Sequence, residues 1–223
     1  MTFSPFTMRK DLSRRMTLAA DLIAFTAAAM LLTMTPGLDT ALVLRSLAAH
    51  GPGAALRAAC GVALGCLGWG VIVAAGLGAL LVASRLAYDL LRWVGAAYLL
   101  YLGIRLLLAP RGTGFTITPE AAQGGQHSFA RGFLTNILNP KVGIFYVSFL
   151  PQFVPPHAPV ALLVLALALI HVCLGLAWFG TLILAARKLL PLLQRPPVMR
   201  AMDRLTGLVF VGFGLKLALS QRG

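Results

Sequence analysis

The chain has 223 residues, of which 59% are hydrophobic and only 11% are charged, and its mean hydropathy is +0.86. A soluble domain of this length could not bury so much apolar surface, so the composition excludes an ordinary soluble protein. The net charge of +13 would suggest a nucleic-acid partner in a soluble protein, but here the basic residues stand singly at the ends of apolar segments. That arrangement is typical of membrane topology signals, and we expect no nucleic-acid partner.

Six apolar segments are each long enough to cross a bilayer, which takes about 20 residues of α-helix. In chain order they lie near residues 22–44, 57–83, 87–108, 132–154, 160–186 and 203–219. They leave almost no sequence for a soluble domain. The sequence therefore predicts an all-α polytopic membrane protein with six transmembrane helices and the lipid bilayer as its surroundings.

The basic residues that flank these segments predict their orientation, because cytoplasmic loops of membrane proteins are enriched in lysine and arginine. Loops one, three and five hold more of them than loops two and four together with the C-terminus, so we expect the odd loops in the cytoplasm. The two sets are Arg45, Arg57, Arg105, Arg111, Arg131, Arg187, Lys188, Arg195, Arg200 and Arg204 against Arg85, Arg92, Lys216 and Arg222.

Residues 1–21 are predicted to be an N-terminal extension, with Met16 as the expected true start. The four basic residues between positions 9 and 15 would weaken the charge difference between the two sides if they belong to the protein. The pair Arg14-Arg15 before an apolar run also occurs in secretory and twin-arginine signals. Because the apolar run continues without an evident end, we favour a first transmembrane segment over a cleaved signal.

Cys60, Cys66 and Cys173 fall inside apolar segments and form no Cys-x-x-Cys pair, so we expect buried, inert thiols. Cys60 and Cys66 should face different sides of a helix, since six residues correspond to a rotation of about 240°. This disfavours a membrane thiol-disulfide carrier. The motif Gly61-x-x-x-Gly65 predicts a close helix contact inside the protein, and a homodimer face is the alternative.

Internal similarity predicts two copies of a three-helix unit. The first segment of each half contains a proline, Pro36 or Pro140, and the third segments end alike, at residues 103–106 and 214–217. Because three is odd, the second copy enters the membrane in the opposite sense, as in inverted-repeat transporters with a site near the midplane. The predicted organisation is a first repeat at 22–109, a flexible cytoplasmic linker at 110–130 and a second repeat at 131–221.

Each proline removes a backbone donor and interrupts its helix, with Gly37 beside Pro36 in the first half. Backbone groups that lose their helical partners in hydrocarbon must be satisfied by protein, water or a ligand. A charged residue follows each break within three positions, Asp39 in the first and Lys141 in the second. A simple kink is the alternative, but two matching breaks with opposite charges favour a binding site.

Asp39 is the only carboxylate well inside a predicted span, where charges are costly and usually functional. Its alternative role is an N-cap for a helix that resumes at Thr40. Lys141 is disfavoured by the helix dipole at a helix start, so it needs a negative partner or extends to the membrane interface. If the breaks meet, the two residues pair or hold the ammonium and carboxylate of a zwitterion. Their expected neutral neighbours are Thr35, Thr40, Asn136 and Asn139.

His171 lies near the middle of the fifth segment, where it either relays protons or packs against a backbone carbonyl, and we favour packing. The sequence has no nucleotide-binding glycines, paired catalytic carboxylates or spaced metal ligands. We therefore expect no enzymatic activity, no cofactor and no resident metal.

Three blocks of the sequence resemble the LysE/RhtB family of bacterial amino-acid exporters, over about residues 16–221. They are Thr35-Pro36-Gly37-x-Asp39-Thr40, Gly95-Ala-Ala-Tyr-Leu-Leu-Tyr-Leu-Gly103 and Arg131-Gly-Phe-Leu-Thr-Asn136-Ile-Leu-Asn-Pro-Lys141-Val-Gly-Ile-Phe-Tyr146. Leu38 departs from the family, which usually has a second proline there. The resemblance implies a six-helix inner-membrane protein that exports amino acids or derivatives such as homoserine, threonine, lysine or leucine, driven by the proton motive force.

On this interpretation the chain is a secondary transporter and proton antiporter. Asp39 couples proton movement to substrate release, Lys141 holds the substrate carboxylate, and two half-bundles rock around them. An exporter of small ions or metal cations on the same scaffold is the alternative.

Overall fold

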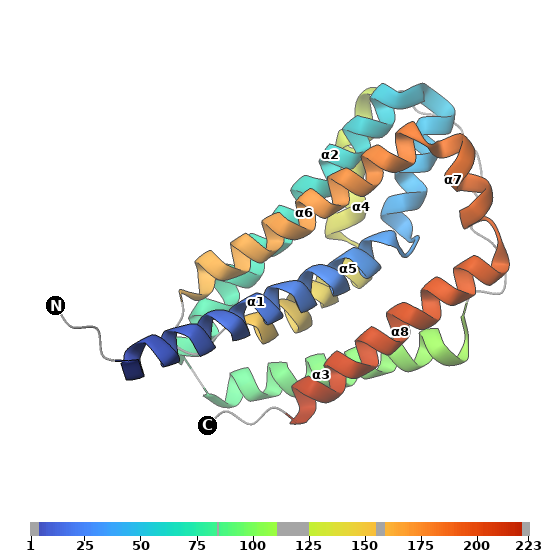
Figure 1. Cartoon of the computed structure of the whole chain (residues 1–223). Coiled ribbons are helices and arrows are strands. Elements are labelled where there is room, and N and C mark those ends of the chain that lie inside the picture. Colours follow the sequence, from blue (N-terminus) through green and yellow to red (C-terminus); the bar gives the residue numbers. More distant parts are fainter. Residues whose placement is uncertain (1–4, 84, 111–124, 155–158, 220–223) are drawn as a thin grey trace.

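The protein is a bundle of helices, and a computed structural model describes its residues 5–83, 85–110, 125–154 and 159–219. Within these ranges it contains helices and turns but no β-strand, so the all-α prediction is confirmed. The longest helices are α1 (Pro5–Met34), α2 (Leu38–Ala83), α3 (Arg85–Leu108), α6 (Val160–Leu184) and α8 (Pro196–Leu219) (Figure 1).

The first break lies where the sequence predicts it, between the end of α1 at Met34 and the start of α2 at Leu38. α2 turns back at Gly51, whose φ of 77° is a left-handed conformation that glycine adopts readily. α1 runs through the predicted boundary at residue 21 as one helix, and the division of the chain into an extension and two repeats stays a prediction. No proline or glycine follows Pro5 in this stretch to end the helix earlier.

The second break separates two short helices. The 3-10 turn η1 (Gly125–His127) leads into α4 (Ser128–Ile137), and after the break the chain forms α5 (Pro140–Ile144), the π-helical η2 (Phe145–Phe149) and the 3-10 turn η3 (Leu150–Phe153). A further helix, α7 (Ala186–Leu193), connects α6 to α8.

The predicted linker at 110–130 falls partly outside the described residues, which resume at Gly125. Its last three residues are helical and belong to α4. The reason is local, since no proline or glycine lies between Gly125 and Gly132 to interrupt a helix.

Two helical stretches of the described chain are long and apolar enough to cross a membrane, Leu38–Gly76 and Val160–Leu184, with hydropathies of 2.0 and 2.8. The first of them includes the turn at Gly51. A shorter apolar helix covers Ala19–Met34. α3 and α8 have 24 residues each, a length of about 36 Å. The six-span inverted repeat stays a prediction.

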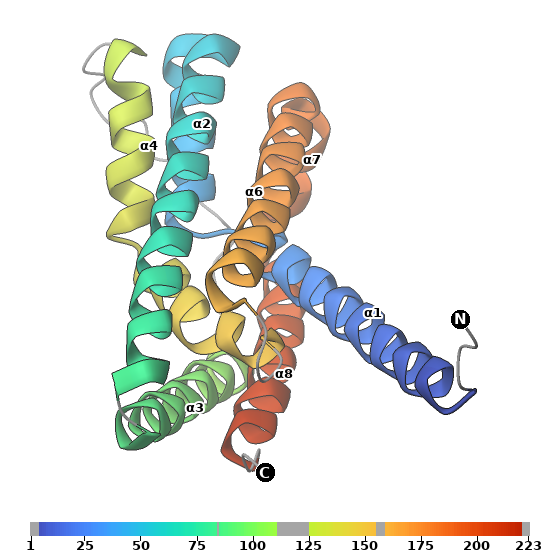
Figure 2. The same ribbon diagram turned by 90° about the vertical axis from the view of Figure 1, so that its left-hand side faces the viewer.

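Helices from the two halves of the sequence are interleaved. α2 packs mainly against α4 and α6, whereas α3 packs mainly against α8 (Figures 1 and 2). Each half therefore contributes to both groups, α2–α4–α6 and α3–α8. The half-bundles expected from the sequence do not form two separate bodies.

Glycines allow the backbones of α2 and α4 to touch. A methyl group on Gly61 would lie 2.0 Å from the carbonyl oxygen of Phe129, and one on Gly132 would lie 2.2 Å from that of Ala58. Such distances are far inside van der Waals contact, so no side chain fits at either position. The contact predicted from Gly61-x-x-x-Gly65 is thus an internal one.

An aromatic cluster fixes α1 against the rest of the bundle. Phe25 of α1 packs on Phe145, Phe149 and Phe153, with ring centroids 5.4 to 6.1 Å apart. Phe213 of α8 completes the cluster, 4.3 Å from Phe149. Because Phe25 is fully buried, these rings position the end of α1 that leads into the first break.

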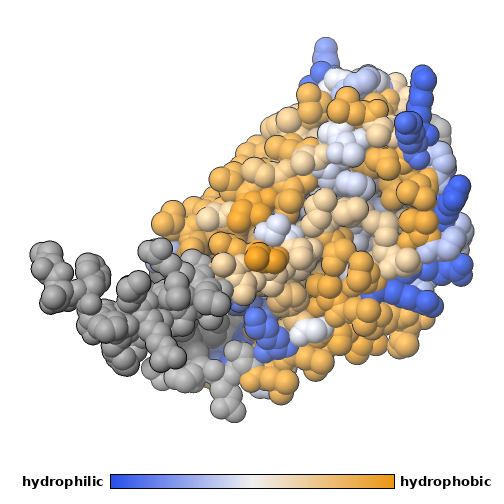
Figure 3. All heavy atoms as spheres, in the orientation of Figure 1, coloured by the Kyte–Doolittle hydropathy of each residue, from blue (hydrophilic) through white to orange (hydrophobic). Residues whose placement is uncertain are grey.

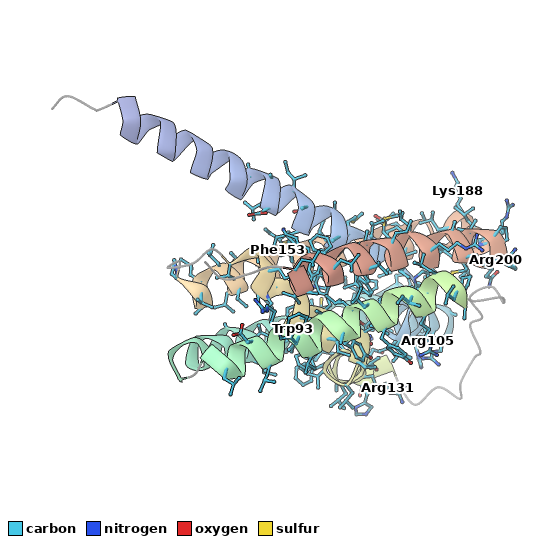
Figure 4. The ribbon with its side chains drawn as sticks, turned by 90° about the horizontal axis from the view of Figure 1, so that it is seen from below. Trp93, Arg105, Arg131, Phe153, Lys188 and Arg200 are labelled. Atoms are coloured by element: carbon cyan, nitrogen blue, oxygen red, sulfur yellow. The ribbon has the colours of Figure 1, made fainter. Side chains whose placement is uncertain are left out.

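The surface carries wide apolar areas, with hydrophilic atoms mainly along one rim of the view in Figure 3. The labelled residues Arg105, Arg131, Lys188 and Arg200 lie toward the same end of the bundle (Figure 4). All four belong to the predicted odd loops. Their placement agrees with the charge pattern that predicts a cytoplasmic end.

The prediction of three buried cysteines is correct only for Cys66. Cys60 and Cys173 are exposed, because on each helix they lie on the outward face of the bundle. Such a face can be apolar in a membrane, so an apolar segment does not show which of its residues are buried. Cys60 and Cys66 do face different sides, as their spacing predicts.

We expect Gly132→Ala to destabilise the fold by about 1–3 kcal/mol, because its methyl group must push α4 away from α2. In detergent this should lower the melting temperature by roughly 2–10 °C. Gly212→Ala on α8 is the matched control, since nothing lies within 4 Å of its added methyl group. Equal melting temperatures for the two variants would contradict the close contact.

Candidate functional site at the two helix breaks

The two breaks meet, and the side chain of Lys141 crosses from the second to the first. Its Nζ donates hydrogen bonds to the carbonyl oxygens of Leu32, at 3.0 Å, and Thr35, at 2.9 Å. In an uninterrupted helix the Leu32 carbonyl would accept from the N–H of residue 36, but Pro36 has none. Lys141 therefore supplies the donor that the proline removes, and its charge lies at the C-terminal end of α1, where the helix dipole favours a cation.

Asp39 lies in the first turn of α2, where the helix dipole favours an anion. Its Oδ2 accepts a hydrogen bond of 2.9 Å from Nδ2 of Asn136, in the last turn of α4. Asn139 and Lys141 also interact with this carboxylate. The interpretation of Asp39 as an N-cap is wrong, because the helix begins before it and the Gly37 carbonyl already accepts the first helical bond, from Ala41.

The second proline creates the same problem for the carbonyl of Asn136, whose helical donor would be the N–H of residue 140. This oxygen accepts from the backbone N–H of Asn139 at 3.0 Å and from Nε1 of Trp69 at 3.4 Å. A side chain at Gly143 would exclude the indole, since a methyl group there would lie 2.6 Å from it. Sequence reasoning missed Trp69, although Gly143 in the block after Pro140 was a signal for a close neighbour.

Asn139 is the N-cap of α5. Its side-chain oxygen accepts from the backbone N–H of Lys141 at 3.1 Å, which satisfies one of the first amides of the resumed helix. The cap fixes the direction in which α5 starts. It thereby also fixes the side chain of Lys141 toward α1.

A cavity of about 50 Å³ lies between the two breaks, large enough for at least one water molecule. Its polar wall comes from the breaks and from two neighbouring helices, and contains Thr35, Asp39, Thr40, Cys66, Asn139, Lys141 and His171. The other walls are mainly apolar and include Leu32, Val62, Ala63, Val142, Val172, Leu176 and Phe179.

The structure thus brings together every residue predicted for the site. The cavity is lined by Thr35, Thr40, Asp39, Asn139 and Lys141. Asn136 does not line it, but donates a hydrogen bond to Asp39. Pro36, Gly37 and Pro140 form the breaks, as predicted.

His171 also lines the cavity, but its partner differs from the expected backbone carbonyl. Its Nδ1 lies 3.1 Å from the hydroxyl of Tyr146. Tyr146 also contacts the thiol of Cys66, which in turn lies 3.4 Å from Nδ2 of Asn136. A continuous set of polar contacts therefore runs from Asp39 to His171, and it includes Tyr146 and Cys66, which were not predicted for the site.

Three buried acceptors in the described part of the chain have no protein partner, Oδ1 of Asp39, Oδ1 of Asn136 and Oε1 of Gln152, and of these three residues Asp39 lines the cavity. Buried polar atoms are nearly always hydrogen-bonded, so acceptors of this kind suit a ligand that brings donors. A group with several N–H bonds, such as an ammonium, satisfies that requirement.

Comparison with known proteins shows which family has this sequence. The family model of the LysE type translocator matches residues 30–221, which include both breaks. The chain belongs to the LysE type translocator family. The sequence resemblance is thereby confirmed, and the protein is a membrane translocator rather than an enzyme.

Relatives of this translocator include proteins with and without a described role. It is 30% identical to the uncharacterized membrane protein YrhP of Bacillus subtilis over 89% of this chain and 99% of that protein. It is 33% identical to an uncharacterized membrane protein of Vibrio cholerae, over 89% and 97% of the two chains. The leucine efflux protein of Salmonella typhimurium is 31% identical, over 86% and 92%. No solved structure matches the chain.

We expect Lys141→Met to destabilise the translocator by about 1–3 kcal/mol, because the Leu32 and Thr35 carbonyls lose their charged donor. The melting temperature of the purified protein measures this loss, with the exposed Lys188→Met as the matched control.

Pro36→Ala should rescue Lys141→Met in part, because alanine restores an N–H that the Leu32 carbonyl can accept within the helix. A double variant no more stable than Lys141→Met alone would show that Lys141 does not replace the donor lost at Pro36.

Proposed function

We propose that this translocator exports amino acids with aliphatic side chains across the bacterial inner membrane. The observation that carries the proposal is the division of the cavity. Its polar wall has one carboxylate and one ammonium, from Asp39 and Lys141, and its remaining walls are mainly apolar. A zwitterion with an apolar side chain matches both parts.

The substrate's α-ammonium fits the side of the cavity formed by Asp39. The partnerless Oδ1 of Asp39, a residue that lines the cavity, is an acceptor, and the carboxylate supplies the opposite charge. The substrate's carboxylate is attracted to Lys141, whose Nζ is held at the end of α1 by two carbonyls. Charge-assisted hydrogen bonds are the strong ones, so this pairing orients the ligand.

Aliphatic side chains are favoured over charged ones by the rest of the lining. Among the described residues around the cavity, Asp39 and Lys141 are the charged ones, and both are used by the α-groups. A lysine or glutamate side chain would find no counter-charge against Val62, Val172 and Phe179, and burying an unpaired charge is costly. The leucine efflux proteins among the relatives agree with this choice.

The carboxylate of Asp39 also suits the coupling of proton entry to substrate export. If Asp39 takes up a proton from the outer side, its attraction for the substrate ammonium falls and the substrate leaves. His171, joined to this region through Tyr146 and Cys66, is the proposed relay. The breaks, as the ends of half-helices, then serve the two inverted repeats in the way that broken helices serve other transporters.

The moving units would be the two packed groups rather than the two sequence halves. α2, α4 and α6 form one group, and α3 with α8 forms the other. The end of the molecule with Arg105, Arg131, Lys188 and Arg200 would face the cytoplasm (Figure 4).

A metal-cation exporter is the weaker candidate. The described residues contain no group of three or more His, Cys, Asp or Glu side chains that could hold a metal ion. Hard cations need six or more oxygen ligands, which an apolar wall does not offer.

The first experiment measures efflux from cells preloaded with labelled leucine, isoleucine, valine, threonine, lysine or glutamate. We expect the wild-type protein to accelerate loss of the aliphatic amino acids, and Asp39→Asn to abolish that acceleration. Asp89→Asn is the matched control, because Asp89 lies 3.6 Å from Arg92 and does not line the cavity. Equal loss of every amino acid in wild type, variants and empty vector would reject amino-acid export and favour a metal cation.

A proton gradient tests the coupling separately. In proteoliposomes loaded with leucine, an acidic outer solution should speed leucine efflux by the wild-type protein, because protons enter as substrate leaves. Asp39→Asn should lose this response to pH even where slow exchange of leucine persists. A variant that still responds fully would exclude Asp39 as the coupling carboxylate.

A further inference from the structure

Buried polar side chains also occur on α8, outside the cavity. Thr206 is 1% exposed and Asp203, one turn earlier, is fully buried. Neither lines the cavity, and neither lies in the sequence blocks around the breaks. The hydroxyl of Thr206 nevertheless reaches the first break, where its Oγ1 lies 2.6 Å from Oγ1 of Thr35, 171 residues away in the chain.

The direction of this hydrogen bond follows from the other partner of Thr35. Its Oγ1 also lies 2.7 Å from the carbonyl oxygen of Leu31, which can only accept. A threonine hydroxyl carries one hydrogen, so Thr35 donates to Leu31 and Thr206 must donate to Thr35. Thr206 therefore acts as a donor toward the last turn of α1.

The backbone of α8 is held firmly at this position. Gly207, the next residue, packs against Gly103 of α3, and a methyl group on either glycine would lie 2.8 Å from the carbonyl oxygen of the other. The two backbones touch there, so Thr206 cannot shift without moving α3 as well. The contact with Thr35 thus ties the end of α1 to the α3–α8 pair.

We propose that Thr206 is a positioning residue for the cavity. Its hydroxyl fixes Thr35, whose carbonyl is one of the two that Lys141 binds, and Thr35 also forms part of the cavity wall. Lys141 holds the end of α1 from the second break, and Thr206 holds it from α8. Without the Thr206 hydroxyl, the polar wall loses its hydrogen bond to α8 and opens more often.

Chemical labelling of Cys66 tests the proposal without any substrate. Cys66 is buried and lines the cavity, whereas Cys60 and Cys173 are exposed and can be replaced by alanine. In this background Thr206→Val, which keeps the shape but removes the hydroxyl, should raise the rate of maleimide labelling of Cys66 about fivefold, as expected for one lost buried hydrogen bond. Thr206→Ser keeps the donor, so Cys66 should be labelled as slowly as in the protein that has Thr206 and lacks Cys60 and Cys173.

Thr35→Val provides a second route, because it removes the acceptor instead of the donor. It should accelerate labelling as Thr206→Val does, and the double variant should label no faster than either single one. The labelling rate of the Thr35→Val variant still decides the proposal if Thr206→Val does not accumulate in membranes. Unchanged labelling in the valine variants, or equally fast labelling in Thr206→Ser, would overturn the proposal.

Efflux kinetics give a further readout, which rests on the proposed function. Thr206→Val should raise the apparent KM for leucine about tenfold and leave the maximal rate within about twofold, because a loosened wall binds less well. Thr206→Ser should restore the KM. A wild-type protein that moves no amino acid would reject the proposed function, while the labelling result would still decide the role of Thr206.

Discussion

Proline inside a membrane helix leaves a carbonyl without its donor, and the rest of this structure depends on how that deficit is met. In hydrocarbon no water replaces the missing N–H, and each unsatisfied group costs several kcal/mol. The Leu32 carbonyl, opposite Pro36, is satisfied by Lys141, and the Asn136 carbonyl, opposite Pro140, by Trp69 and the Asn139 amide. Each break is therefore completed in part by a side chain from elsewhere in the chain, and Lys141, which belongs to the second break, holds the two breaks together.

The charges of the site follow from the same constraint. A lysine at the start of a helix is unfavourable on its own, but Lys141 reaches the C-terminal end of a different helix, where a cation is favourable. Asp39 lies at a helix start, where an anion is favourable. Helix ends thus hold the two opposite charges on one cavity wall. The same contacts that stabilise the fold therefore also form a site for a zwitterion.

The residues that form the two breaks and the charged site could be predicted from local chemistry. Proline removes a hydrogen bond from a helix interior, so Pro36 and Pro140 indicated the breaks, and a carboxylate and a lysine beside them in apolar surroundings marked the site. The close approach at Gly61 was likewise predictable, because a residue without a side chain is favoured where backbones meet.

The partners of these residues were not predictable in the same way. Trp69, Tyr146 and Thr206 act across long stretches of sequence, and each is a residue type that an apolar helix carries for packing alone. Cys60 and Cys66 fall in equally apolar surroundings, yet only Cys66 faces the protein interior. Hydropathy does not distinguish lipid from protein as a neighbour, so neither the buried face of a helix nor its partner helix can be read from composition.

The contacts that hold the two packed groups differ in kind from those that hold the breaks. Between α2 and α4, and between α3 and α8, backbones touch at glycines, and any sliding brings atoms into collision. At the breaks, by contrast, Lys141, Asn136 and Thr206 make hydrogen bonds between separate helices. A hydrogen bond can be exchanged for another at little net cost, whereas a close-packed seam cannot. An ammonium and a carboxylate entering the cavity therefore compete with the contacts at the breaks and leave the glycine seams intact. Under the proposed function, substrate binding therefore acts on hydrogen bonds that can be exchanged at little net cost.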